Sequence, residues 1–184
     1  MAIEKIVIVG GGTAGWMAAA PLSRLMQGGQ NGGRKLSVTL VESEVIGTVG
    51  VGEATIPPFR EFNQALEISD REMLSNVQGT FKLGIQFENW GARGDKYIHP
   101  FGNYGYTIGG MSFHQVWHHM KSLGDNRPIQ AFNVETMAAY FGRFMRSADV
   151  KRDDLPPVNY AYHLDAGQYA RFLRKYAEAR GVVR

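Results

Sequence analysis

The chain has 184 residues, of which 44% are hydrophobic and 20% are charged, and its formal net charge is +3. This composition is typical of a folded domain with an apolar core, and its mixed acidic and basic residues argue against nucleic-acid binding. Cysteine is absent, which excludes disulfides, thiolate nucleophiles and cysteine metal sites. The apolar run near the start, Ile6–Val9, is too short for a signal peptide or a membrane span. We therefore expect a cytoplasmic protein that does not contact a membrane.

The first twenty residues have the pattern of a strand, a glycine turn and a helix. The apolar run Ile6–Val9 leads directly into a GxGxxG motif formed by Gly10, Gly12 and Gly15, and helical sequence follows from Trp16. In a dinucleotide site these glycines allow the tight turn, the approach of backbone to a pyrophosphate, and close packing of helix on strand. The N–H groups at the start of such a helix attract phosphate.

A second predicted strand, Lys35–Val41, ends at Glu42, where an acidic side chain can accept hydrogen bonds from a ribose. Glu42 lies 27 residues after Gly15 rather than the usual 20 or so, and the glycine-rich stretch Gln27–Arg34 accounts for the excess as a loop. The pattern therefore predicts a dinucleotide site. The alternative is a glycine turn in a βαβ unit that binds nothing.

The apolar, glycine-rich stretch Val45–Pro58 is predicted to be a loop that lies against a flat ligand such as a flavin ring, or else a buried structural loop. Pro57 and Pro58 favour the start of a helix over Phe59–Leu66. Ser69 and Glu72 form a capping box for a helix that reaches about Val77 and stops at Gly79.

The run Phe81–Glu88 alternates between apolar and polar residues and is predicted to be one half-buried strand. Lys82 then lies on its polar face, where most lysines are simply solvated. The aromatic and glycine-rich segment Tyr97–Phe113 is predicted to be irregular and suited to a flat ligand. In the helix predicted over Met111–Leu123, His114 and His118 lie one turn apart, but no third ligand is evident, so we predict no metal site.

Two further helices are predicted in the C-terminal part. Asn133 can cap a helix to about Met145, and Asp165 can cap a helix over Ala166–Arg180 that stops at Gly181. The run Val182–Val183 then resembles the start of a strand that returns to the sheet. Five residues at helical spacing in the first of these helices are expected to be core: Val134, Met137, Ala138, Phe141 and Met145.

Several of these segments resemble one family, the flavin-dependent tryptophan halogenases. Val7–Ala19 resembles the opening of these enzymes, and Gly50–Pro57 is similar to their second glycine fingerprint. Phe81–Trp90 is similar to the segment that bears their catalytic lysine, and His99–Gly102 to the aromatic segment that sandwiches the indole ring. Tyr162–Val182 resembles the helix before the third strand of the flavin domain.

The resemblance implies an α/β fold: an FAD-binding Rossmann-like βαβ domain of the flavin monooxygenase type, incomplete in this chain and interrupted by an irregular strand and helix insertion. We predict that 1–58 and 158–184 form the dinucleotide-binding part and that 59–157 is the insertion. Lys82 takes the catalytic role, and His99 and Phe101 bind the substrate. Thirteen residues are predicted to bind the cofactor: Gly10, Gly12, Thr13, Ala14, Gly15, Glu42, Ser43, Ile46, Val49, Val51, Gly52, Glu53 and Ala54.

The implied activity is halogenation of an indole or another electron-rich aromatic. A separate flavin reductase supplies reduced FAD by diffusion, and hypohalous acid forms from chloride or bromide at the flavin hydroperoxide and reaches the substrate through Lys82. The alternatives are an aromatic hydroxylase of the flavin monooxygenase class and a non-catalytic FAD-binding fragment. A homodimer is left open.

The chain also departs from the family. Its members are far longer, and their WxWxIP motif and the glutamate that works with the lysine are absent here. Gly91–His99 is shorter than the corresponding segment of typical free-tryptophan halogenases, so the substrate need not be tryptophan itself. We expect this chain to be the N-terminal portion of such an enzyme and to be inactive by itself.

Overall fold

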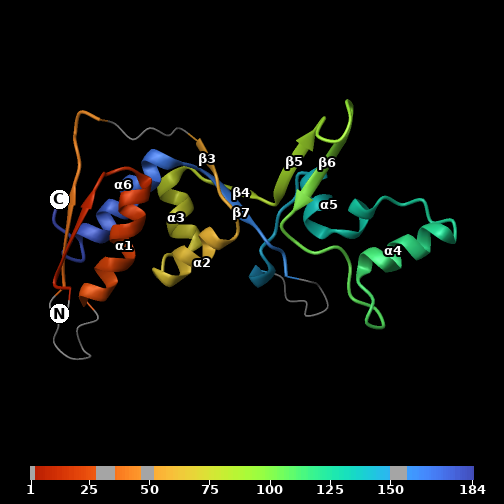
Figure 1. Ribbon diagram of the computed structural model, residues 1–184, viewed down its shortest axis with the longest axis horizontal. Coiled ribbons are helices and arrows are strands. Elements are labelled where there is room, and N and C mark those ends of the chain that lie inside the picture. The colour runs from red at the N-terminus through yellow and green to blue at the C-terminus, as the bar shows by residue number, and fades with distance from the viewer. Residues whose placement is uncertain (1–2, 28–35, 47–51, 150–156) are drawn as a thin grey trace. The chain divides into compact units, whose positions relative to one another are not determined.

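The computed structural model describes residues 3–27, 36–46, 52–149 and 157–184. It divides into two compact units, one made of residues 1–80 with 162–184 and the other of residues 81–161 (Figure 1). Over the described ranges, no helix combines the length and apolar character needed to cross a membrane.

The first unit is built on a parallel sheet. Strand β1 (Lys5–Val9) pairs with β2 (Ser37–Val41), and Lys5 lies opposite Ser37 in the register. Val183 adds a parallel bridge to Thr39, because the Leu40 N–H donates to its carbonyl at 2.8 Å. Both predicted strands are therefore confirmed, and so is the return of Val182–Val183 to the sheet.

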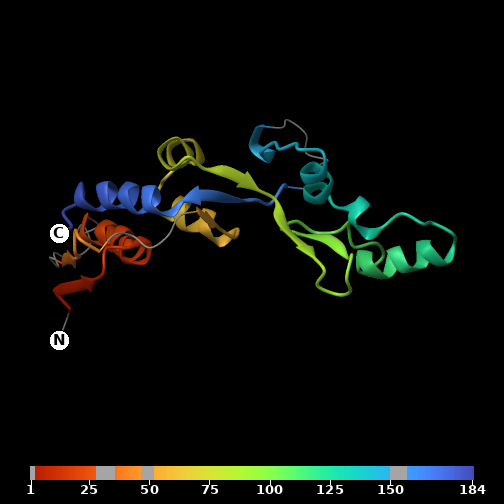
Figure 2. The ribbon, with the colours of Figure 1, turned by 90° about the horizontal axis from the view of Figure 1, so that it is seen from above.

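Two helices cover this sheet and meet each other. Helix α1 (Thr13–Gln27) packs against α6 (Ala166–Glu178), and the two lie side by side in Figures 1 and 2. Small residues allow their backbones to approach closely, and large ones fill the space between helices and sheet. The fully buried residues here include Trp16, Ala19, Ala20, Leu40, Leu173 and Ala177.

The predicted signals at the ends of α6 are confirmed. The Asp165 carboxylate accepts the backbone N–H of Gln168 at 2.7 Å, and this bond lowers the pKa of Asp165 below its ordinary value. Gly181 has a φ of +96°, which a glycine adopts without strain, and it reverses the chain toward Val183.

The helices α2 (Pro58–Ala65) and α3 (Asp70–Val77) complete the first unit. Ser69 caps α3 by accepting the Glu72 N–H, as predicted, but the left-handed residue that ends α3 is Gln78 (φ +51°) rather than Gly79. The buried Tyr169 hydroxyl donates to Asn63 Oδ1 at 2.9 Å and so ties α2 to α6. Strand β3 (Gly52–Ala54) pairs antiparallel with β7 (Ala161–Asp165).

The second unit contains an antiparallel hairpin. The segment predicted as one strand forms β4 (Thr80–Lys82) and β5 (Gly84–Glu88), and β5 pairs with β6 (Lys96–Pro100). The single-strand prediction was wrong because the strand is interrupted at Leu83, where the alternation of buried and exposed residues breaks. Lys82 and Leu83 are both buried as a result, so Lys82 does not lie on a solvated face.

The helical part of the second unit consists of α4 (Phe113–Ser122) and α5 (Val134–Tyr140), with 3-10 turns at Ile129–Phe132 and Ser147–Asp149. Asn133 caps α5 as predicted, but the helix ends five residues early because the chain turns at Gly142 (φ +60°). The predicted core stripe is also wrong: Val134, Phe141 and Met145 are exposed. The buried residues of α5 are the polar Glu135 and Thr136.

Candidate functional site

A cavity of about 780 Å³ opens in the first unit where β1 and β2 end. The Gly10 N–H donates to the Val41 carbonyl at 2.8 Å and holds the two strand ends together. The carboxyl end of a parallel sheet is where such folds bind ligands. The cavity is lined by Val9, Gly10, Gly11, Gly12, Thr13, Ala14, Val41, Glu42, Ser43, Ile46, Glu53 and Ala166.

The three motif glycines have different roles in this geometry. Gly10 has a φ of +116°, so it makes the turn that other residues adopt only with strain. A Cβ at Gly12 would meet no atom within 4 Å, which leaves this stretch of backbone open to the cavity. A Cβ at Gly15 would lie 1.8 Å from the Gly10 carbonyl oxygen, so Gly15 permits the close packing of α1 on the turn.

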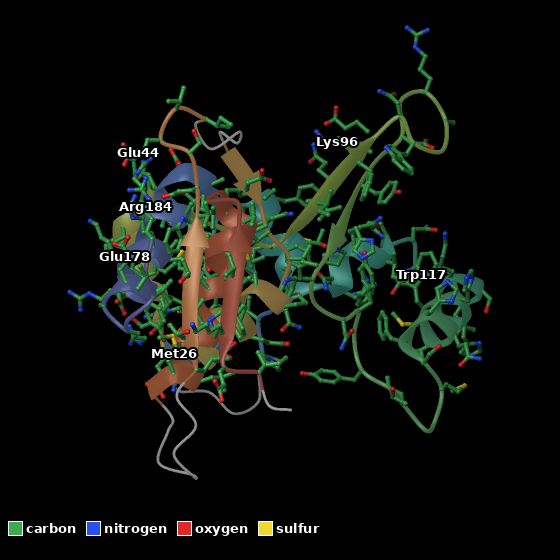
Figure 3. All side chains as sticks on the ribbon, turned by 60° about the vertical axis from the view of Figure 1, so that its left-hand side comes forward. Met26, Glu44, Lys96, Trp117, Glu178 and Arg184 are labelled. Atoms are coloured by element: carbon green, nitrogen blue, oxygen red, sulfur yellow. The ribbon has the colours of Figure 1, made fainter. Side chains whose placement is uncertain are left out.

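Glu42 lies at the edge of the cavity with its side chain 13% exposed. Its Oε1 forms an ion pair with the Arg184 guanidinium, and Arg174 Nη1 approaches the same oxygen at 3.4 Å. Arg184 also pairs with Glu44 at 3.0 Å, and Figure 3 shows these two side chains next to each other. The two arginines fix the position of the Glu42 carboxylate, and sequence reasoning missed both of them.

Gly11 explains how the Glu42 carboxylate reaches this position. A Cβ at Gly11 would overlap Glu42 Oε2 at 1.4 Å, so any larger residue there would displace the carboxylate. Gly11, the second residue of the three-glycine run, was not predicted to have a role. The run of three glycines was the sequence feature that could have indicated a role for Gly11.

The ends of two helices border the cavity. Thr13 at the start of α1 donates its hydroxyl to the Ala166 carbonyl at 3.2 Å, which brings the first residues of α1 and α6 together. Ser43 Oγ accepts the backbone N–H groups of Val45 and Ile46 at 3.2 and 3.3 Å, and so orders the chain after β2. The positive dipole ends of α1 and α6 at this rim favour an anionic ligand.

The remaining predicted cofactor residues are placed differently. Gly52 and Ala54 belong to β3 and are exposed, but they do not line the cavity, whereas Glu53 between them does. Val49 and Val51 lie outside the described residues. Val9, Gly11, Val41 and Ala166 also line the cavity and were not predicted. Val9 and Val41 are apolar residues at the ends of β1 and β2, and Ala166 is the first residue of α6, so none of these three carries a chemical signal of its own.

In the second unit the buried Lys82 lies against an aromatic ring. Its Nζ is 5.3 Å from the centre of the Phe101 ring, and the whole residue is only 7% exposed. Burial lowers the pKa of Lys82 below its ordinary value, because the charged ammonium loses hydration. The Phe101 N–H donates to the Leu83 carbonyl at 3.0 Å, so the residue next to Lys82 also positions Phe101.

The structure brings Lys82 and Phe101 together but leaves His99 with its side chain exposed. His99 lies opposite Ile85 in the β5–β6 register. Lys82 and Phe101 therefore form a cation and ring pair within the second unit.

Glu135 supports this segment and was missed by sequence reasoning. It is only 3% exposed, and its Oε1 accepts the Asn159 N–H at 2.9 Å. A Cβ at Gly102 would lie within 2.2 Å of the Glu135 carboxylate, so Gly102, next to Phe101, is packed directly against it. No role was predicted for Glu135, which lies beside a stripe of apolar residues that the pattern assigned to the core.

Comparison with known proteins identifies the family to which these features belong. Residues 5–184 match the family described as tryptophan halogenase. The chain belongs to this family. A tryptophan 6-halogenase of Streptomyces toxytricini is 34% identical over 97% of the chain, and a tryptophan 7-halogenase of Lentzea aerocolonigenes is 32% identical over 99%.

The fold of the halogenase family is confirmed by solved structures. A flavin-dependent halogenase from Xanthomonas campestris is 46% identical over the whole chain with a TM-score of 0.87, and one from Brevundimonas sp. BAL3 is 40% identical with a TM-score of 0.83. The predicted α/β, Rossmann-like fold class is therefore confirmed. The chain spans about a third of these proteins: 35% of each of the two structures and 36% of the Streptomyces enzyme.

Proposed function

We propose that the whole protein is an FAD-dependent halogenase that acts on an indole or another electron-rich aromatic. The observation that carries the proposal is the buried Lys82 against Phe101, in a chain whose relatives are halogenases over nearly its full length. Within the proposed enzyme, 1–58 and 158–184 form the dinucleotide-binding part, and 59–157 is the insertion that carries Lys82. The proposal places the protein in the cytoplasm.

The cavity of the first unit fits a dinucleotide. The open backbone at Gly12 allows a pyrophosphate to approach, and Glu42 offers carboxylate oxygens as acceptors to a ribose. Thr13 and Ala14 at the start of α1 are proposed to contact the phosphates, and Ser43, Ile46 and Glu53 are proposed to contact other parts of the dinucleotide, since all five line the cavity. When bound, reduced FAD supplies two electrons that, with two from the halide, reduce dioxygen to water and hypohalous acid.

Lys82 is proposed to receive the hypohalous acid and to steer it to one carbon of the substrate. Its lowered pKa leaves more neutral amine at a given pH than an exposed lysine has, and a neutral amine can form a haloamine. In its ammonium form, Lys82 can instead hold hypohalous acid by a hydrogen bond. In both cases the position of Lys82 beside Phe101 directs the oxidant toward a substrate ring that stacks on Phe101.

The substrate is proposed to stack on Phe101, with His99 on the exposed side of the same segment. Chloride or bromide serves as the halide, and a separate flavin reductase delivers reduced FAD by diffusion. The residues 1–184 by themselves are proposed to be inactive, since they cover only about a third of the related enzymes. A homodimer of the whole protein is compatible with this proposal.

An assay of the whole gene product tests the activity. The purified protein is incubated with FAD, a flavin reductase, chloride or bromide, and a panel of indoles and phenols, and products are identified by mass. We expect a monohalogenated product that requires both halide and reductase. Products that are hydroxylated and never halogenated would identify the protein as an aromatic hydroxylase instead.

Replacing Glu42 tests the ribose contact. Glu42→Ala removes the acceptor and leaves Arg174 and Arg184 without their shared carboxylate, so we expect FAD affinity to fall about 10- to 100-fold, as for a lost hydrogen bond to a charged group. The measurement is a titration followed by flavin fluorescence. Glu44→Ala is the matched control, because Glu44 also pairs with Arg184 but its side chain is 79% exposed. Equal affinities of the two variants would contradict the assignment.

A further inference from the structure

The sequence predicted no metal site at His114 and His118 because it offers no third ligand, but the geometry of the pair changes this interpretation. We propose that His114 and His118 on α4 form a two-histidine binding site for a divalent transition-metal ion, a site separate from the proposed halogenation chemistry. The two residues lie four apart on the helix, so they project from the same face. Their Nε2 atoms are 3.1 Å apart, and their rings are inclined at 85° with centroids 4.5 Å apart. Both side chains are exposed, so an ion can reach them from solvent.

The separation of the two nitrogens fits a shared ion. Metal to imidazole nitrogen bonds are about 2.0–2.1 Å long, and two such bonds to nitrogens 3.1 Å apart enclose an angle of about 98°. This lies between the angles of about 90° for a tetragonal site and about 109° for a tetrahedral one. Without the ion, the same geometry lets one ring donate its N–H to the other, and metal binding displaces that proton.

The ligand set determines which ions suit the site. Among residues 3–27, 36–46, 52–149 and 157–184, no group of three or more histidine, cysteine, aspartate or glutamate side chains could hold a metal ion. The site therefore offers two imidazoles, and water completes the coordination. Imidazole ligands favour the later first-row divalent ions, with Cu²⁺ bound more tightly than Ni²⁺ or Zn²⁺.

Trp117 provides a local reporter for binding. Its ring centroid is 5.0 Å from that of His118 and 6.1 Å from that of His114, and Figure 3 labels it on α4. Lys121 lies one turn further along α4, and its Nζ is 4.9 Å from the centre of the Trp117 ring. A Cu²⁺ ion between the two histidines lies close enough to the indole to quench its fluorescence.

The test is a titration of the chain with Cu²⁺, followed by tryptophan fluorescence and by calorimetry. We expect one ion per chain, quenching that a chelator reverses, and affinity that falls at least about tenfold in His114→Ala and in His118→Ala as one of two ligands is lost. Trp117→Phe should abolish most of the quenching while the heat of binding remains. Zn²⁺ should bind at the same site with lower affinity.

His119→Ala is the matched control, since His119 is exposed on the same helix and has no partner histidine at a spacing of four. Its affinity should match that of the unaltered chain. Circular dichroism checks that each variant keeps its helix content. If His114→Ala loses helix content, His114→Gln is used in its place. Equal weakening by His119→Ala, or unchanged affinity in both His114 and His118 variants, would overturn the proposal.

Discussion

Lys82→Ala in the whole protein is expected to lower halogenation by about 10²- to 10³-fold or more, the cost of removing one preorganised polar group from an active site. The lysine lies buried beside Phe101, where no other described cation contacts that ring, and water cannot replace its amine. FAD binding and release of hydrogen peroxide should persist, because the dinucleotide cavity is formed by other residues. Product formation and peroxide are measured in the same reaction.

Lys96→Ala is the matched control for this prediction. Lys96 is in the neighbouring strand β6, its side chain is 56% exposed, and it pairs with Glu88 at 3.2 Å on the surface. Its loss should leave halogenation within about twofold of the unaltered enzyme, as surface ion pairs contribute little. Lys82→Met retains most of the apolar volume of the side chain, so a stable but inactive Lys82→Met variant separates chemistry from folding. Normal halogenation by Lys82→Ala would show that the lysine is structural.

Gly12→Val and Gly15→Ala are expected to abolish flavin binding by different routes. A side chain at Gly12 extends into open space in the cavity, so valine should lower FAD affinity at least about 100-fold while the melting temperature stays nearly constant. A methyl group at Gly15 would collide with the Gly10 carbonyl, so alanine should destabilise the fold by about 1–3 kcal/mol or more. Flavin titration and thermal unfolding are measured on both variants.

The contrast between these two glycines is the critical result. Loss of stability in Gly12→Val would mean that the backbone there is packed rather than open. Tight FAD binding by Gly12→Val would place the pyrophosphate elsewhere. Gly52→Ala is a useful control, since no atom lies within 4 Å of a Cβ at that position and Gly52 does not line the cavity.

The exposed face of α5 shows where pattern reasoning failed. The spacing of Val134, Phe141 and Met145 predicted a core helix, yet Phe141 is 71% exposed and the helix ends at Tyr140. Periodicity indicates that one face is apolar, but it does not indicate what covers that face. For the same reason the burial of Glu135 could not be predicted from periodicity, because it results from the positions of Asn159 and Gly102 around the carboxylate.

The sequence by itself determined the local elements and their caps. Residues within a few positions of one another set the strand, glycine turn and helix of the first twenty residues and the acidic residue after β2. The same is true of the helix caps at Ser69, Asn133 and Asp165. Turn geometry and capping hydrogen bonds depend on such short spacings. For this reason the fold class and most of the cavity could be predicted.

Only the tertiary structure decided the environment of the functional side chains. Burial lowers the pKa of Lys82, which lies next to the break between β4 and β5 at Leu83. Arg174 and Arg184 anchor Glu42 from more than 130 positions away in the chain. The 3.1 Å contact of His114 with His118 depends on side-chain rotamers that spacing permits but does not select. Burial and ion pairing arise from atoms that are distant in sequence, so no local pattern specifies them.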